Sequence, residues 1–264
     1  MNLNVQHTEF NDFHRRSQII RKKGGVFGEL MPKDEDFSRA LYTFDIGQND
    51  LNGGHFVNMT TDQIKAIVPE LIDQLTAPIK DIYDQGGRSF WIHNTGPFGC
   101  SPAALETFLI TGGQIDEVEC TIPYNEVAQL FNSKLKEAVV QLRKELPEAA
   151  LTYVDVYTIK YDLISHAKKH GFQQPLTSCC GYGGKYKYSP YYGCGRKVTL
   201  HDIKVTVGSC KDPSVMLNWD GIHYTQAANK WIAERIISGL YSDPPIPLKM
   251  ACHKELDINL VTPY

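Results

Sequence analysis

A chain of 264 residues, 42% of them hydrophobic, can bury a sizeable core and fits one α/β domain. Its 27 basic and 30 acidic residues give a net charge of −3, so no global positive field would attract nucleic acid or an anionic membrane. No apolar run reaches the roughly 18 residues of a membrane-spanning helix, so we expect no stable membrane anchor. The expected partner is a small molecule.

The first half of the chain alternates helical and extended patterns. In order, they predict a helix over residues 5–23, a strand over 40–46, a helix over 61–85 and a strand over 89–93. The first helix is amphipathic and is expected to end at Gly24-Gly25. The first strand is stopped by the turn-forming sequence GQND, and Pro78 is expected to kink or split the second helix.

The second half continues this alternation. It predicts a helix over residues 124–146, a strand over 151–156, and helices over 158–170 and 225–240. Strands separated by long helices predict a parallel sheet with helices on both faces, joined by right-handed crossovers. Residues 172–218 are rich in Gly, Tyr and Cys and predict an irregular excursion, and a loosely structured tail begins at Asp243. We therefore expect a single domain over residues 1–264 that contains this excursion.

Cysteine usage and the amino terminus point to different compartments. Structural disulfides, typical of an oxidising compartment, are expected among four cysteines of the excursion, with Cys180 to Cys194 as one candidate bridge and the connectivity otherwise open: Cys179, Cys180, Cys194 and Cys210. Asn58-Met59-Thr60 matches the glycosylation acceptor pattern, which is also common by chance. Yet the first residues are too polar for the apolar core of a secretory signal peptide. These observations agree if the natural polypeptide begins upstream of this sequence.

Ligands of parallel α/β sheets bind beyond the carboxyl ends of the strands, and three predicted loops meet there. The loop after residues 40–46 holds Asn49, whose carboxamide can donate a hydrogen bond to an oxygen that becomes negative only in a transition state. Gly47 would permit the sharp turn that aims this side chain. A turn selected only for its Gly, Asn and Asp content explains the same residues equally well.

The loop before the last helix places the carboxylate of Asp220 three residues before the imidazole of His223. A nearby aspartate can hold a histidine in the tautomer of a general base, so His223 is the candidate base and Asp220 the candidate orienting acid. The alternative is a surface turn in which the two side chains share no task.

Other chemistries have weaker support. His166 and His170 have a metal-binding spacing, but lysines lie between them and no third ligand is evident, so we expect no metal site. Without a Cys-x-x-Cys, a Walker loop or a G-x-G-x-x-G, no zinc, redox or nucleotide cofactor is expected. Five tyrosines of the excursion could stack on a sugar or acyl chain, although aromatic packing is their commoner role: Tyr182, Tyr186, Tyr188, Tyr191 and Tyr192.

Four segments follow one another along the chain: TFDIGQND (residues 43–50), NTGPFGC (94–100), CCG (179–181) and WDGIHYT (219–225). Together they resemble the plant GDSL esterase/lipases of the SGNH hydrolase superfamily. The resemblance implies a three-layer α/β/α, flavodoxin-like hydrolase, usually secreted, that cleaves carboxylic esters without a metal or other cofactor. By position, His223 matches the base, Asp220 the orienting acid and Asn49 one donor of the oxyanion hole.

The chain departs from this family in two blocks. The family's Gly-Asp-Ser block supplies the nucleophilic serine, and its second block supplies a glycine donor, but neither block occurs here. A Gly-x-Ser-x-Gly elbow is also absent, and Ser101 and Ser209 lack the strand-to-helix setting that exposes a nucleophile. We therefore expect an N-terminally truncated chain without the first strand and helix of the sheet, with an exposed sheet edge and weak or absent esterase activity.

Two functions follow from these expectations. The first is a GDSL-type carboxylic-ester hydrolase whose partner is a small acyl ester, such as a lipid, an acetylated sugar or a specialised metabolite. The second is a non-catalytic truncated isoform, or a protein that binds carbohydrate or lipid esters without cleaving them. The sequence does not select among these substrates.

Overall fold

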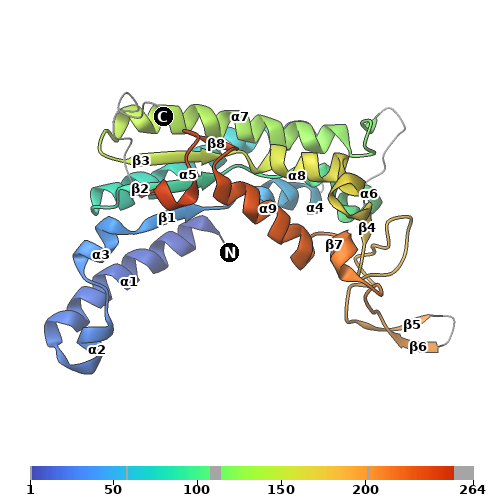
Figure 1. Ribbon diagram of the computed structural model, residues 1–264, viewed down its shortest axis with the longest axis horizontal. Helices are drawn as coiled ribbons and strands as arrows, with labels where there is room; N and C mark the ends of the chain where they lie inside the picture. Colours follow the sequence, from blue (N-terminus) through green and yellow to red (C-terminus); the bar gives the residue numbers. More distant parts are fainter. Residues whose placement is uncertain (1, 58, 108–113, 201–202, 253–264) are drawn as a thin grey trace, which may run out of the picture.

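The computed structural model describes residues 2–57, 59–107, 114–200 and 203–252 of the chain. Within these ranges a four-stranded sheet has the order β1-β2-β3-β8, and its strands are β1 (Leu41–Phe44), β2 (Ser89–His93), β3 (Ala150–Val154) and β8 (Ser242–Asp243). The first three strands are parallel, and β8 is antiparallel to β3 (Figure 1). The predicted α/β class with a mostly parallel sheet is confirmed.

One face of the sheet is covered by two long helices, α5 (Thr61–Asp84) and α7 (Ile122–Glu145). Their apolar sides pack on inward-facing strand residues, among them Phe90 and Leu151, which are almost completely buried. A capping box between Thr60 and Gln63 begins α5. The helix runs as one element from Thr61 to Asp84 with Pro78 inside it, so of the two outcomes predicted for Pro78, a kink or a split, the split does not occur.

The opposite face is covered by α9 (Gln226–Ser238) and by the segment that follows it. The buried side chains of Trp91 and Val154 pack there against Ile236 of α9 and against Ala251. Helix α8 (Val156–Ser165) lies beside α9 (Figure 1). The helix predicted over 158–170 ends earlier than expected, at Ser165, and a 3-10 turn, η3 (Ala167–His170), follows it. The sheet is thus a middle layer between helices.

The amino-terminal elements lie beside the edge strand β1. Helix α1 (Leu3–Lys23) ends at Gly24 as predicted, and two short helices follow, α2 (Gly25–Leu30) and α3 (Asp34–Arg39). The ring of Phe10 in α1 contacts the ring of Tyr42 edge-on at 5.7 Å between centroids, and Figure 1 shows α1 running alongside β1. Strand β1 therefore forms one edge of the sheet within the described ranges.

The segment after β1 differs from its prediction. Gly47, with a φ of 113°, redirects the chain, but the residues after it form helix α4 (Gln48–Phe56) instead of an extended turn. Asn49 accordingly lies in the first turn of a helix. Asn and Asp favour helix starts as well as turns, and this dual preference explains the error. A 3-10 turn, η1 (Phe98–Cys100), and helix α6 (Pro102–Thr107) likewise follow β2.

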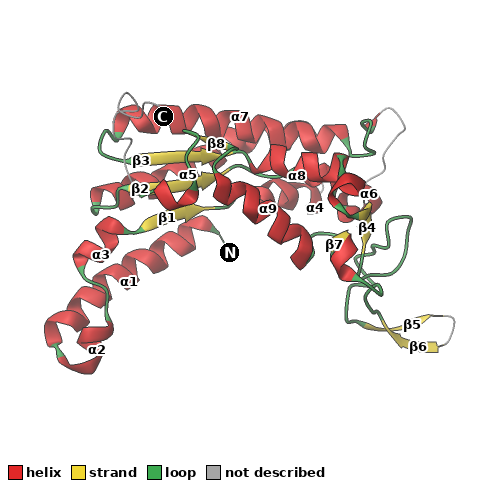
Figure 2. Cartoon of the chain, in the orientation of Figure 1, coloured by secondary structure: helices red, strands yellow, loops and turns green. Residues whose placement is uncertain are grey.

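The excursion over residues 172–218 contains more regular structure than its composition predicts. Strands β4 (Gln173–Ser178) and β7 (Met216–Asn218) form a parallel pair, and β5 (Lys197–Leu200) and β6 (Ile203–Thr206) form an antiparallel one. A 3-10 turn, η4 (Pro213–Val215), leads into β7. Figure 2 shows these short strands joined by long loops. Non-local pairing of such short strands leaves little pattern in the sequence.

Disulfides are present in the described ranges, as predicted. They join Cys100 to Cys120, Cys179 to Cys210 and Cys180 to Cys194, so the candidate bridge from Cys180 to Cys194 is confirmed. The predicted loose tail is ordered up to Cys252, since β8 and η5 (Leu248–Met250) pack on the sheet and Ala251 is fully buried. The glycosylation pattern at Asn58 lies outside the described residues.

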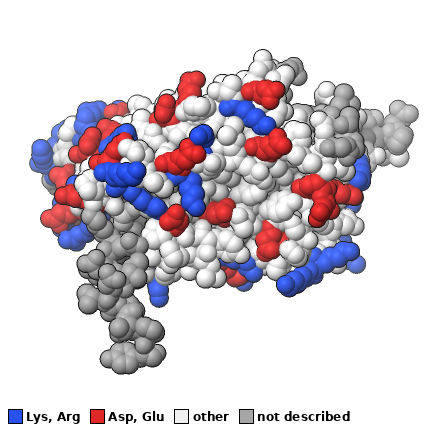
Figure 3. Space-filling model, turned by 90° about the horizontal axis from the view of Figure 1, so that it is seen from above, with Lys and Arg blue, Asp and Glu red and all other residues white. Residues whose placement is uncertain are grey.

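The surface agrees with the small net charge. Acidic and basic side chains are intermingled over the face that Figure 3 shows. None of the helices in the described ranges combines the length and the apolar composition that crossing a bilayer requires.

Candidate active site

The turn between β7 and α9 brings Asp220 and His223 into direct contact. Nδ1 of His223 lies 2.7 Å from Oδ2 of Asp220. The other carboxylate oxygen, Oδ1, accepts hydrogen bonds from the backbone N–H groups of Ile222 at 3.0 Å and His223 at 2.8 Å. Gly221 adopts a φ of 95°, which lets the chain reverse between the two side chains. The spacing of three residues therefore brings the carboxylate and the imidazole within hydrogen-bond distance.

The turn is anchored at both ends. The backbone N–H of Trp219 donates to the carbonyl of His223 at 2.7 Å, which closes the turn. The hydroxyl of Thr225 donates to the carbonyl of Met216 at 2.6 Å and accepts from the N–H of Ala228 at 3.2 Å. Thr225 thus joins β7 to the first turn of α9, where its side chain is the N-cap.

The contacts of Asp220 favour its charged form. Partial burial alone would raise the pKa of Asp220. The hydrogen bonds that it accepts from the backbone N–H and the imidazole of His223, and from the backbone N–H of Ile222, outweigh burial and lower the pKa. A neutral imidazole that donates its Nδ1 proton to this carboxylate keeps the lone pair of Nε2 available as a base. The side chain of His223 is 73% exposed, so the imidazole can meet a ligand from solution.

His223 and Asn49 line the same cavity, of about 520 Å³. The cavity lies between the turn before α9, the segment from β1 into α4, and the start of α1, and its lining is Asn2, Gln6, Asp45, Ile46, Gly47, Gln48, Asn49, Asp50, Ile222 and His223. The structure therefore brings the candidate base and the candidate oxyanion donor to one place from distant parts of the sequence. Gln6 and Asp50 also line the cavity, and no sequence pattern identified either of them as a site residue.

Serines are absent from the residues that line this cavity in the described part of the chain. Both serines considered as substitute nucleophiles lie elsewhere: the hydroxyl of Ser101 accepts a hydrogen bond from the N–H of Ala104 near the start of α6, and the backbone of Ser209 pairs with that of Cys180. Neither residue is among the cavity lining.

A second acidic and basic group occurs at the ends of β1 and β2. Nδ1 of His93 lies 3.6 Å from Oδ2 of Asp45, and the indole N–H of Trp91 donates to Nε2 of His93 at 3.0 Å. Interaction with His93 lowers the pKa of Asp45, and burial lowers the pKa of nearby Lys160. The sequence analysis did not select Asp45 or His93. The two residues lie at the carboxyl ends of adjacent parallel strands, and this position could have identified them.

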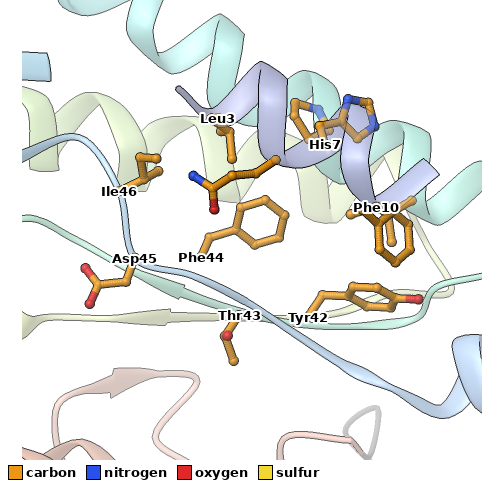
Figure 4. Close-up of a pocket in the computed structure, with 11 residues that line it drawn as sticks. Leu3, His7, Phe10, Tyr42, Thr43, Phe44, Asp45 and Ile46 are labelled. Carbon is orange, nitrogen blue, oxygen red and sulfur yellow. The ribbon is translucent and has the colours of Figure 1, made fainter. Parts of the chain in front are cut away.

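A smaller, mostly apolar cavity of about 180 Å³ lies between α1 and β1 (Figure 4). It shares Gln6, Asp45 and Ile46 with the larger cavity. Figure 4 shows the rings of Phe10 and Phe44 between the helix and the strand. Because β1 is an edge strand of the described sheet, this cavity runs along a strand side that no other described strand occupies.

The two histidines with a metal-binding spacing serve a different purpose. His166 and His170 both approach the carboxylate of Asp162, at 3.0 Å and 3.6 Å. Within the described residues, no group of three or more His, Cys, Asp or Glu side chains could hold a metal ion.

Comparison with known proteins places these features in a family. The model of the GDSL-like lipase/acylhydrolase family matches residues 1–236, which include the β1-to-α4 segment and the Asp220–His223 turn. The chain belongs to the GDSL lipase/acylhydrolase family. The family recognised from the four sequence segments is thus confirmed, and with it the relationship to ester hydrolases.

Curated relatives of this GDSL chain come from several plants. It is 53% identical over 253 residues to a GDSL esterase/lipase of Arabidopsis thaliana, covering 96% of this chain and 67% of that protein. It is 54% identical to an esterase of Hevea brasiliensis and 52% identical to the GDSL esterase/lipase ACHE of Zea mays, covering 96% of this chain and 64% and 65% of those proteins. The GDSL chain therefore spans about two thirds of the length of these relatives.

Proposed function

We propose that this chain carries the acid–base part of a carboxylic-ester hydrolase site. His223 is the general base, Asp220 orients it, and Asn49 donates to the oxyanion, with Gly47 setting the turn that precedes Asn49. The observation that supports this assignment best is the shared cavity of Asn49 and His223, in which the imidazole also contacts Asp220 at 2.7 Å. The proposal treats residues 1–264 as one hydrolase-like domain that includes the excursion over 172–218.

The proposed chemistry is acyl transfer through a serine. Nε2 of His223 takes the hydroxyl proton as the serine oxygen bonds to the ester carbonyl carbon, and the amide of Asn49 stabilises the negative oxygen that forms. The proton then passes to the departing alcohol, which leaves an acyl-enzyme. A water molecule deprotonated by the same imidazole releases the carboxylic acid and restores the serine.

The described lining of the cavity contains no serine that could act as the nucleophile. With no serine among the described residues that line the cavity, we expect weak or absent esterase activity from these 264 residues alone. A base and an oxyanion donor without a nucleophile retain roughly 10³ to 10⁴-fold acceleration over water when the remaining site stays ordered. The edge of β1 that pairs with no other described strand lies next to the smaller cavity, and we propose that a further segment of a longer polypeptide brings the serine there.

The proposed substrate is a small acyl ester, with lipids, acetylated sugars and specialised plant metabolites as candidates. The three disulfides favour an oxidising, extracellular setting, in which the pattern at Asn58 would be available for glycosylation. An open polar cavity suits such ligands.

Hydrolysis of p-nitrophenyl acetate tests the assignment of the base. Low activity that disappears in His223→Ala and persists in His166→Ala, a control on the surface of the same protein, would support it. Measurable activity that is equal in the wild type and His223→Ala would refute it. A fluorophosphonate probe tests the nucleophile separately: stoichiometric labelling of one serine would contradict the expectation of weak activity.

The absence of a serine from the described cavity lining favours one alternative, a non-catalytic protein that binds carbohydrate or lipid esters. In that case calorimetry would detect a stable complex with an acyl ester that remains intact in the mixture. Binding that weakens in Asn49→Ala, without release of acid, would favour this alternative over hydrolysis.

A further inference from the structure

The excursion packs directly behind the Asp220–His223 turn. The backbone N–H of Cys179 donates to the carbonyl of Asn218 at 2.9 Å, and that of Cys180 donates to the carbonyl of Trp219 at 2.6 Å. The two cysteines also begin the disulfides to Cys210 and Cys194. The cysteine-rich segment is therefore bonded to the two residues that immediately precede Asp220.

Tyr188, within the loop that the Cys180–Cys194 disulfide closes, contacts this turn. A β-carbon at Gly221 would lie 2.4 Å from Cδ2 and 3.1 Å from Cγ of the Tyr188 ring, so the ring lies flush against the glycine backbone. Ser178 approaches the same point, with its hydroxyl 3.1 Å from that position. Burial, together with the charge of Asp220, raises the pKa of Tyr188, which is consistent with a tyrosine that faces this carboxylate.

The loop that carries Tyr188 is itself fixed. The N–H of Ser178 donates to the carbonyl of Tyr186 at 3.0 Å, and the carboxylate of Glu106 accepts from the N–H of Tyr186. A β-carbon at Gly181 would lie 2.4 Å from the carbonyl oxygen of Lys187, so the two backbones touch across the loop. Tyr188 is therefore presented by a segment with little freedom to move away from the turn.

The catalytic pair has little support on its other side. The His223 side chain is 73% exposed, so few neighbouring side chains enclose its imidazole. Besides its internal hydrogen bonds and those from Cys179 and Cys180, the turn accepts one from the N–H of Ala103, which donates to the carbonyl of Gly221 at 3.0 Å, and it packs against the Tyr188 ring. Restriction of the turn must come from these contacts behind it.

We propose that Tyr188 is a positioning residue for the Asp220–His223 pair, and that the disulfide-closed loop 180–194 serves to hold its ring against Gly221. The proposal rests on the function proposed above, because it assigns the pair a task that needs a fixed imidazole. The positioning effect depends on packing of the ring and not on its hydroxyl group. A phenylalanine at this position should therefore preserve it. The ring thereby lowers the number of turn conformations in which Nδ1 of His223 and Asp220 separate.

Proton NMR of the His223 Nδ1–H tests the proposal without any need for turnover. The resonance is expected in the wild type, in Tyr188→Phe and in Tyr191→Ala, a control in the same loop whose side chain is 75% exposed. In Tyr188→Ala, exchange of this proton with water should become about tenfold faster, because the less restricted turn more often adopts conformations in which the hydrogen bond between His223 and Asp220 is open. Tyr188→Leu, which keeps an apolar side chain, provides a second variant if the alanine variant does not fold.

The outcomes separate the two proposals. An unchanged Nδ1–H exchange rate in a folded Tyr188→Ala or Tyr188→Leu protein would overturn the positioning role, even if its melting temperature falls. The hydrolase proposal fails instead when the wild type hydrolyses the ester at a measurable rate and His223→Ala leaves that rate unchanged. Faster exchange in Tyr188→Ala with wild-type behaviour in Tyr188→Phe would support the role of the ring.

Discussion

The ring of Phe131 in α7 occupies the space that a β-carbon at residue 47 would need, since Cζ of Phe131 would lie only 2.6 Å from it. Gly47 also has a φ of 113°, a conformation that residues with side chains rarely adopt. The direction in which α4 leaves β1, and with it the position of Asn49 at the cavity, therefore depends on a glycine packed against an aromatic ring.

Gly47→Ala should lower the free energy of unfolding by about 2–4 kcal/mol, because backbone strain adds to the overlap with Phe131. Chemical denaturation monitored by circular dichroism measures the change. Gly53→Ala, in the helix that follows Gly47, is the matched control, since its β-carbon would meet no atom within 4 Å. That substitution should be neutral or slightly stabilising. Equal effects of the two substitutions would contradict this account.

Asn132 in α7 supports the loop after β2 with both ends of its amide. Its Oδ1 accepts from the N–H of Thr95 and its Nδ2 donates to the carbonyl of Thr95, each at 2.9 Å, and all four groups are buried. Asn132→Ala should lower the free energy of unfolding by about 2–4 kcal/mol, because two buried backbone groups lose their partners. The neighbouring Ser133→Ala, at an exposed position, should change it little. Denaturation midpoints that coincide for the two variants would count against the prediction.

Asp220 should make stability depend on pH in the acid range. Its pKa is lower in the folded protein than in the unfolded chain, so its contribution is present above the ordinary aspartate pKa near 4 and is lost as the pH falls through the lower folded value. The difference in unfolding free energy between the wild type and Asp220→Asn should therefore be constant between about pH 5 and pH 7 and shrink below about pH 4. Urea titrations at several pH values measure it.

The same urea titrations on Asp73→Asn, a substitution at an exposed position of α5, provide the matched control. A difference in unfolding free energy between the wild type and Asp220→Asn that stays constant down to about pH 3 would show that the contacts with His223 and Ile222 do not stabilise the carboxylate.

The disulfide between Cys100 and Cys120 should contribute substantially to stability. Both residues are buried, and the bond closes a sequence separation of 20 residues. Replacing both cysteines by alanine should lower the free energy of unfolding by about 3 kcal/mol, through the greater freedom of the unfolded chain. Cys252→Ala, which removes an exposed free cysteine, should have no measurable effect. A thermal shift that is the same for both variants would refute this expectation.

The parallel strands could be predicted from the sequence because each is a short buried run with turn-forming residues at its end. The predicted strands 40–46, 89–93 and 151–156 overlap β1, β2 and β3. Strand β8 escaped prediction since it has only two residues and pairs with a distant part of the chain. The helix α4 escaped because glycine, asparagine and aspartate favour a turn and a helix start alike.

Parts of the candidate site that depend on local spacing could also be predicted. Asp220 and His223 lie three residues apart, so one turn suffices to join them. Gln6 of α1 and Tyr188 of the excursion reach the site only through the packing of distant segments. No local pattern marks Gln6, and the tyrosine cluster does not indicate which of its five rings contacts the turn. The contact between Asp45 and His93 falls between these cases, since it follows from the adjacency of two parallel strands.

The consecutive half-cystines Cys179 and Cys180 have a practical consequence for anyone preparing this protein. Adjacent side chains on an extended segment project to opposite sides, so the two bonds tether different loops, one of which holds Tyr188. The four cysteines involved can pair in three ways, and only the pairing of Cys179 with Cys210 and of Cys180 with Cys194 gives the loop arrangement of the structure. Material made in a reducing host and oxidised afterwards should thus contain shuffled isomers, and coexpression with a disulfide isomerase should raise the native yield.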